Sequence, residues 1–177
     1  MRTGFHGRFP LATSTLTVKK TPALVRETKS EAETVALAQA VGGLLKPGDW
    51  IALVGELGSG KTVFVKGLAA ALHVQDAPTS PTFSIVQTHR PQKGHVPLRH
   101  VDLYRLTPAE IPALEWEELH EDSGVTAVEW AEKGQFLWPN QAVPVRISHQ
   151  GQDTRRFEFF VYGSRSEEII KSLKRLT

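Results

Sequence analysis

The sequence predicts an α/β fold in which buried strands alternate with helices. Two short apolar runs, Trp50–Val54 and Val125–Val128, have the length and composition of buried strands. A glycine-rich segment at residues 55–62 follows the first run directly, and the helix-like stretch Val63–Leu72 follows that segment. A strand, a tight loop and a helix in succession are typical of α/β domains. The 177 residues are enough for one such domain with its own hydrophobic core.

Helices are predicted on both sides of this segment. One is predicted to begin at Ser30, because Glu33 three residues later completes a capping box. Thr107, directly before a proline, starts a second helix, which Pro112 would make short or irregular. A C-terminal helix is predicted from Ser164. The residues expected on the inner faces of the first and last helices are Val35, Ala38, Val41 and Leu45, and Ile169, Ile170 and Leu173.

One further strand is predicted near the N-terminus, and two antiparallel pairs are predicted later in the chain. Leu24 and Val25 predict a short first strand. The antiparallel pairs expected later in the chain are Phe83–His89 with Leu98–Leu103, and Val143–Ser148 with Arg156–Tyr162.

The composition is that of a soluble globular protein, with 40% hydrophobic and 23% charged residues. No apolar run approaches the roughly 20 residues that span a bilayer, so no membrane association is predicted. Cysteine is absent, which excludes a disulfide framework, a thiol nucleophile and a cysteine metal site. The lack of disulfides suits a reducing compartment, and we expect a cytoplasmic protein.

The charge distribution argues against direct binding of nucleic acid. Residues 1–26 carry five bases and no acid, whereas residues 27–177 carry the other 16 bases and all 19 acids. The folded body is therefore slightly acidic, with a formal charge of −3 against the +5 of the N-terminal segment. We expect any role in RNA chemistry to act through a partner protein.

The first 20 residues are predicted to be a flexible N-terminal extension, outside a domain that spans residues 21–177. They mix Gly, Pro, Ser and Thr with scattered bases and have no stable hydrophobic period. A secretory signal is not expected, because the segment lacks an apolar stretch of about 7–15 residues. A cleaved organellar targeting peptide and an over-long gene start remain alternatives to a disordered tail.

The strongest motif is the sequence GELGSGKT at residues 55–62, which matches G-x-x-x-x-G-K-[ST] in full. Gly55 and Gly60 let the backbone curl so that successive N–H groups point at phosphate oxygens. The helix that follows adds its positive N-terminal end. Lys61 is a point charge for the β- and γ-phosphates, and the Thr62 hydroxyl is the expected Mg²⁺ ligand. The segment therefore predicts a nucleotide-binding P-loop.

Two acids at strand ends are candidates to complete this site. Glu129 follows the apolar run Val125–Val128, and Asp102 follows Leu98-Arg-His-Val101. The carboxyl ends of parallel strands face the ligand crevice in open α/β sheets. A carboxylate placed there is costly unless it meets a cation such as Mg²⁺. A surface acid just past a strand is the plainer interpretation of each.

Other candidates carry a weaker signal. Residues 79–83 form a hydroxyl-rich loop that could supply a group to the γ-phosphate, although such clusters are usually just loops. Trp130 could pack near the nucleotide, although a tryptophan beside a strand end is more often part of the core. The seven histidines show no metal-ligand spacing.

Together these segments resemble one family. The P-loop, then SPTF at residues 80–83, HVDLYR at 100–105 and VEW at 128–130 occur in the order and spacing of the bacterial TsaE (YjeE) ATPases. The resemblance covers roughly residues 30–156. The P-loop is shared by very many proteins, whereas the other three motifs are far more specific. TsaE proteins act in making threonylcarbamoyladenosine beside the tRNA anticodon.

The resemblance implies a P-loop NTPase fold with a mixed, mostly parallel central sheet flanked by helices. It implies a weak ATPase that uses ATP/ADP and Mg²⁺, works with a TsaB–TsaD pair and meets tRNA only indirectly through these partners. The catalytic residues implied are Glu129, Asp102 and Lys61, and the metal ligands are Thr62, Glu129 and Asp102. The nucleotide contacts implied are Glu56, Leu57, Gly58, Ser59, Gly60, Lys61, Thr62, Thr82, Trp130 and Glu31.

Two other functions remain open from the residues alone. A small-molecule kinase would also use a P-loop, but it usually needs an Arg-bearing lid, and no Arg-rich stretch lies between Val63 and Glu129. The other alternative is a nucleotide-sensing module without useful catalysis. The presence of Lys61, Thr62 and Glu129 argues against it. Slow hydrolysis is expected, because the P-loop, residues 80–83 and residues 128–130 hold no second base, and Arg105 is a weak candidate for a catalytic cation.

Overall fold

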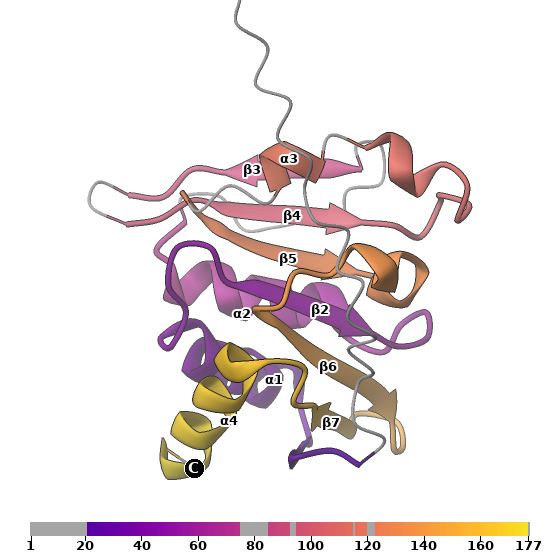
Figure 1. Ribbon diagram of the computed structural model, residues 1–177. Helices are drawn as coiled ribbons and strands as arrows, with labels where there is room; N and C mark the ends of the chain where they lie inside the picture. The colour runs from indigo at the N-terminus through magenta and orange to yellow at the C-terminus, as the bar shows by residue number, and fades with distance from the viewer. Residues whose placement is uncertain (1–20, 75–84, 93–94, 115, 120–122, 177) are drawn as a thin grey trace, which may run out of the picture.

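The computed structural model describes residues 21–74, 85–92, 95–114, 116–119 and 123–176. These residues form a seven-stranded sheet with the strand order β1-β7-β6-β2-β5-β4-β3 (Figure 1). The strands are β1 (Leu24–Thr28), β2 (Trp50–Val54), β3 (Val86–His89), β4 (Leu98–Asp102), β5 (Val125–Glu129), β6 (Ala142–His149) and β7 (Arg155–Phe159).

The centre of the sheet is parallel and its edges are antiparallel. Strands β6, β2, β5 and β4 run parallel to one another, while β1, β7 and β3 pair antiparallel with their neighbours. This confirms the α/β class and the mixed, mostly parallel sheet. In the ladder register Leu53 pairs with Glu129, and Glu129 pairs with Asp102. The carboxyl ends of β2, β5 and β4 therefore meet at one edge of the sheet.

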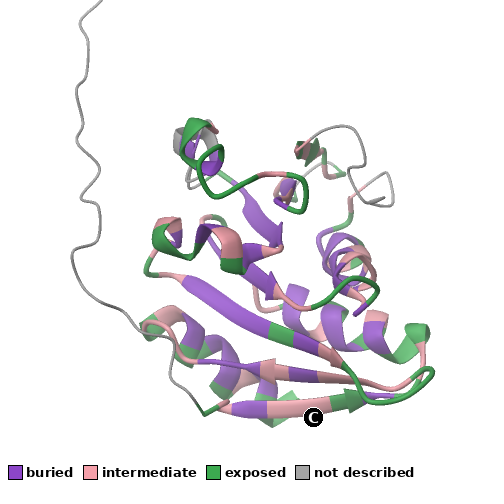
Figure 2. Ribbon diagram, turned by 90° about the vertical axis from the view of Figure 1, so that its right-hand side faces the viewer, coloured by how far each residue is buried: buried purple, intermediate pink, exposed green. Residues whose placement is uncertain are grey.

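Helices cover both faces of the sheet, and the two faces bury separate hydrophobic cores. The larger core lies between the sheet and the helices α1 (Glu31–Gly42), α2 (Lys61–Ala71) and α4 (Ser164–Leu176). The second core is covered by short elements: the 3₁₀ helices η1 (Ile111–Ala113) and η2 (Ala131–Leu137), and α3 (Trp116–Leu119). Because both faces are covered, the central strands are buried along most of their length (Figure 2). None of the helices in the described part of the chain is long and apolar enough to cross a membrane.

Helix α1 begins as predicted, because the Ser30 hydroxyl accepts a hydrogen bond from the backbone N–H of Glu33 at 3.1 Å. It packs closely against α2. A Cβ added at Gly67 would collide with Ala38, and this small-residue contact lets the two helices approach. Helix α1 ends at Gly42, so Leu45 lies beyond the helix, although it still packs against the larger core as predicted. Ala38 and Val41 are buried, whereas Val35 is only half-buried.

Two other predicted elements differ in the structure. The helix expected from Thr107 is wrong: residues 107–110 form turns, followed by the three-residue η1. The Glu110 carboxylate accepts hydrogen bonds from the Thr107 backbone N–H and hydroxyl, which closes a local turn, and Pro112 has no N–H to continue a helix. The predicted hairpin forms between β3 and β4, and β3 begins at Val86; residues 83 and 84 lie outside the described residues. The C-terminal helix confirms its prediction, with Ile169, Ile170 and Leu173 buried.

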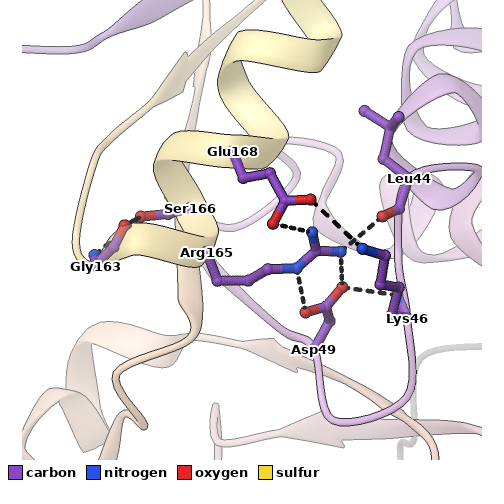
Figure 3. A network of polar contacts seen from close by, with 7 residues as sticks. All are labelled: Leu44, Lys46, Asp49, Gly163, Arg165, Ser166 and Glu168. Carbon is purple, nitrogen blue, oxygen red and sulfur yellow. Dashed lines mark hydrogen bonds and ion pairs between the residues drawn. The ribbon is translucent and has the colours of Figure 1, made fainter.

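An ion-pair network joins α4 to the turn before β2 (Figure 3). Arg165 donates to both carboxylate oxygens of Asp49, at 2.8 and 2.6 Å, and to the backbone oxygen of Leu44 at 2.8 Å. Glu168 accepts from Arg165 at 2.7 Å and from Lys46 at 3.4 Å. These hydrogen bonds raise the pKa of Arg165 and lower that of Glu168. Asp49 directly precedes β2, so the network fixes the amino end of the strand whose carboxyl end enters the P-loop.

Candidate functional site

The P-loop lies where the motif predicted, between β2 and α2. Gly60 directly precedes α2 and has φ 105°, and Gly58 has φ 75°; both are left-handed conformations that strain other residues. A Cβ added at Gly55 would collide with the backbone oxygen of Ile147 on β6. Glycine is therefore required at the start of the loop for close packing and at residues 58 and 60 for backbone geometry.

Lys61 folds back over the loop that precedes it. Its ammonium group donates to the backbone oxygens of Gly55 and Glu56, both at 2.8 Å, and lies 4.0 Å from the centroid of the Trp130 ring. Burial lowers the pKa of Lys61, and the nearby carboxylates of Glu129, Glu132 and Asp102 oppose that shift. The positive charge is therefore held at the loop by carbonyl dipoles, an aromatic face and surrounding acids.

Glu129 is the acid that the fold brings to the first turn of α2. The Thr62 hydroxyl donates to both of its carboxylate oxygens, at 2.9 Å to Oε1 and 3.1 Å to Oε2. Nε2 of His100 lies 2.8 Å from the same Oε1. Glu129 is 3% exposed. The two residues predicted as metal ligands at the end of β5 and the start of α2 are therefore in direct contact.

Asp102 lies beside Glu129, in register across β4 and β5. Its Oδ1 accepts a hydrogen bond from the backbone N–H of Tyr104 at 2.9 Å, which holds the carboxylate at the turn after β4. The charge of this carboxylate is one of those that oppose the lowering of the Lys61 pKa by burial. The structure thus places Asp102 beside Glu129 at the end of the neighbouring strand, and its role near a metal stays a prediction.

Trp130 has an unusual backbone and a position over Lys61. Its φ of 56° is left-handed, which is uncommon for a bulky residue and is frequent at functional sites. The ring is half-buried and packs against Tyr104 at 4.9 Å between centroids. Lys133 donates to the backbone oxygens of Tyr104 and Leu106 and so ties the turn after β4 to η2.

The β6–β7 hairpin supplies residues that the sequence analysis missed. A hollow of about 450 Å³ lies beside the loop, lined by Val54, Gly55, Glu56, Trp130, Glu132, Arg146, Ile147, Ser148 and His149. His149 also lies near Gly58, and Arg155 lies near Gly60. Arg146 reaches this place because it pairs with Val54 in the parallel β2–β6 ladder. The sequence predicted the hairpin, but no local pattern predicts its pairing with β2, so three basic side chains near the P-loop were overlooked.

Some predicted contacts lie at the margin of the site or outside the description. Glu31 is exposed at the start of α1, and its carboxylate forms a 4.0 Å ion pair with Lys66 of α2. Leu57 is 72% exposed at the tip of the loop, and Glu56 lines the hollow. Arg105 is exposed in the turn after β4. Thr82 lies outside the described residues.

The oxygen set at the P-loop fits Mg²⁺ bound together with phosphates. Thr62 and Glu129 offer a hydroxyl and a carboxylate, both hard oxygen ligands, at one place. Within the described ranges no group of three or more His, Asp or Glu residues is placed to hold a metal ion by itself. Mg²⁺ typically binds through one or two protein ligands together with water and substrate phosphates. Thr62 and Glu129 could provide the protein ligands in such a site.

Comparisons with known proteins identify the family to which the chain is similar. The family model described as "Threonylcarbamoyl adenosine biosynthesis protein TsaE" matches residues 28–157. The tRNA threonylcarbamoyladenosine biosynthesis protein TsaE of Bacillus subtilis (strain 168) is 36% identical over 143 residues, which are 81% of this chain and 89% of that protein. The protein of that name from Nostoc sp. (strain PCC 7120) is 32% identical over 141 residues, 77% of this chain and 85% of that protein.

A solved structure extends the likeness to the fold. The crystal structure of Bacillus subtilis YdiB matches with a TM-score of 0.72 and 33% sequence identity, over 90% of this chain and 97% of that chain. The region that the family model matches, residues 28–157, contains the P-loop, the His100–Arg105 segment and the Glu129-Trp130 pair. This chain therefore belongs to the TsaE family.

Proposed function

We propose that this protein binds ATP and ADP with Mg²⁺ at its P-loop, hydrolyses ATP slowly, and is required for threonylcarbamoyladenosine modification of tRNA next to the anticodon. The observation that carries the proposal is the contact of Thr62 with Glu129 beside a complete phosphate-binding loop. The names of the TsaE relatives support the pathway. The proposed place of action is the cytoplasm.

The chain's own residues divide the work at the phosphates. Backbone N–H groups of the loop and the N-terminus of α2 would bind the β- and γ-phosphates, and Lys61 would move its ammonium group from the loop carbonyls toward them. Thr62 and Glu129 would hold the metal, with Asp102 near its water ligands. Mg²⁺, when bound, neutralises charge on the phosphate oxygens. Trp130 covers Lys61 and would exclude water from one side of the site.

We propose slow hydrolysis because the arginine that lies near Gly60 already donates hydrogen bonds elsewhere. Arg155 is the arginine that comes near Gly60, but its guanidinium donates to the backbone oxygens of Gln152 and Thr154 at 3.2 and 3.1 Å. Efficient NTPases place a cation at the transferring phosphoryl group, and one supplied by another protein can raise the rate by about 10³–10⁵. We therefore propose that the TsaB–TsaD pair completes the site or accelerates turnover, and that tRNA is reached through that pair.

The test is to deplete the protein in its own organism and to measure threonylcarbamoyladenosine in bulk tRNA. We expect the modification to fall and to return when the wild-type chain is supplied, but not when the Lys61→Ala variant is supplied. A small-molecule kinase with the same P-loop would leave the modification unchanged. An undiminished level of the modified nucleoside after depletion would therefore contradict the proposed function.

A further inference from the structure

We infer that His100 is a positioning residue that orients the Glu129 carboxylate for the metal, an inference that rests on the proposed function. Nε2 of His100 lies 2.8 Å from Oε1 of Glu129, and Thr62 contacts the same carboxylate from the other element. Oε1 therefore has two partners, whereas Oε2 has only the longer contact to Thr62 at 3.1 Å among the described residues. The imidazole therefore holds Oε1 of Glu129 in place. Oε2, with fewer contacts, keeps more of its capacity to bind a cation.

The burial of both partners makes this contact strong enough to set an orientation. The His100 side chain is 0% exposed and that of Glu129 is 4% exposed. A carboxylate buried to this degree requires hydrogen-bond donors, because it has lost most of its hydration. The Thr62 hydroxyl would turn toward the metal as its ligand, so the imidazole is the donor that stays with Glu129 when the metal binds.

The hydrogen-bond network also assigns the tautomer of His100. Its Nδ1 is buried and has no hydrogen-bond partner among the residues that the structure describes. Because the Glu129 carboxylate oxygen can only accept, the geometry supports a ring that carries a proton on Nε2 and donates it to Glu129.

The location of His100 in the sheet favours a positioning role over a catalytic one. His100 pairs with Ala127 in the β4–β5 ladder, whereas Asp102 pairs with Glu129 two residues further along. The imidazole thus lies behind the strand ends, inside the protein, and reaches Glu129 from the core side. A residue with no exposed surface cannot touch the nucleotide, so it acts through the carboxylate. In metal sites such outer partners typically change metal affinity by about 10- to 100-fold when they are removed.

The test compares two amides at position 100. In His100→Gln the amide nitrogen can take nearly the place of Nε2 and still donate to Glu129, whereas in His100→Asn it is too short to do so. The matched control is Thr126→Val on the neighbouring strand β5, which removes a buried hydrogen bond from the Thr126 hydroxyl to the backbone oxygen of Leu119 in α3. ADP binding by the full-length chain is measured by calorimetry in EDTA and across a MgCl₂ titration, together with thermal unfolding.

We expect all four proteins to bind ADP equally in EDTA. In the titration we compare the Mg²⁺ concentration that gives half of the metal-dependent change in ADP affinity. This concentration should be about 10- to 100-fold higher for His100→Asn, and close to the wild-type value for His100→Gln and Thr126→Val. An unchanged Mg²⁺ requirement in His100→Asn, or equal losses in the Asn and Gln variants, would overturn the positioning role. Wild-type binding that is indifferent to Mg²⁺ would instead contradict the metal site of the proposed function, and the inference with it.

Discussion

The ammonium group of Lys61 lies 4.0 Å from the centroid of the Trp130 ring, and Tyr104 packs on the same indole at 4.9 Å. The lysine that should bind phosphate is thus in contact with the aromatic residue that follows the proposed metal ligand Glu129. A phosphate that draws the ammonium group away from the loop carbonyls would also change the cation–π contact with Trp130. The occupancy of the loop and the surroundings of the indole are therefore physically linked.

From this contact we expect ADP to change the tryptophan fluorescence of the protein. The three other tryptophans, Trp50, Trp116 and Trp138, are buried in the second core, so their surroundings should respond less. Titration with ADP in the wild type and in Trp130→Phe measures the contribution of Trp130. If the change persists in full in Trp130→Phe, the indole does not report the site.

Replacing Lys61 by alanine should weaken ADP binding by about 1.5–3 kcal/mol, because one charge-assisted contact to phosphate is lost. This corresponds to a decrease in affinity on the order of 10- to 100-fold. Calorimetry gives the affinity directly. The matched control is Lys66→Ala, one turn along the same helix, where only an exposed 4.0 Å ion pair with Glu31 is lost. Wild-type affinity in Lys61→Ala would refute the phosphate-binding role.

Replacing Glu129 by glutamine should lower single-turnover ATP hydrolysis by at least about 10²-fold while ATP binding largely survives. The loop's own phosphate contacts remain in this variant, and glutamine keeps the volume of the buried side chain. Glu132→Gln is the control, because Glu132 is an acid of the hollow beside the loop, whereas the Thr62 hydroxyl donates to Glu129. Comparable hydrolysis in Glu129→Gln and Glu132→Gln would show that Glu129 is not essential.

The TsaB–TsaD pair, rather than tRNA alone, should raise the ATPase rate of the wild type. The reasons are the slightly acidic body at residues 27–177 and the expectation that the catalytic cation is supplied by another protein. Single-turnover hydrolysis is measured for the protein alone, with the pair and with tRNA. Fast turnover by the protein alone, or stimulation by tRNA without the pair, would be the contrary result.

Removing the guanidinium in Arg165→Met should lower the free energy of unfolding by about 3 kcal/mol, because the buried Asp49 carboxylate loses its two hydrogen bonds from this side chain. Urea unfolding measures the change. Arg156→Met is the matched control: Arg156, whose side chain is 35% exposed, pairs with Glu27 at 3.5 Å and Glu158 at 3.4 Å, and an exposed pair contributes at most about 1 kcal/mol. Equal effects of the two variants would show that the Arg165 network adds no special stability.

Glu168 should contribute to the loss of stability at acidic pH. The hydrogen bond from Arg165 lowers the pKa of this carboxyl below its ordinary 4.5. The stability that this interaction adds is therefore present above pH 4.5 and is lost as the pH falls through the lowered pKa of the folded state. Unfolding of the wild type and of Glu168→Gln from pH 6 downward should show a difference that shrinks in this acidic range. A difference that does not change with pH would contradict the assignment.

The sequence alone determined the features that depend on neighbouring residues. The glycines of the P-loop, the Ser30 cap of α1 and the apolar runs of β2 and β5 act within a few residues, so a local pattern predicted them. The same locality failed at Thr107, where a turn closed by Glu110 and the missing N–H of Pro112 outweighed the helix start. The family resemblance also came from the sequence alone, through four short motifs and their order and spacing along the chain.

Only the tertiary structure decided how these segments meet. The parallel order β6-β2-β5-β4 brings Arg146 beside Val54. It also sets Glu129 against His100 and against Thr62, which lies 67 positions earlier in the chain. Hydrophobic periodicity states which face of a strand is buried, but it does not state which strand lies beside it. The donors around the Glu129 carboxylate and the basic residues of the β6–β7 hairpin depend on that pairing, and for this reason they became visible only in the folded chain.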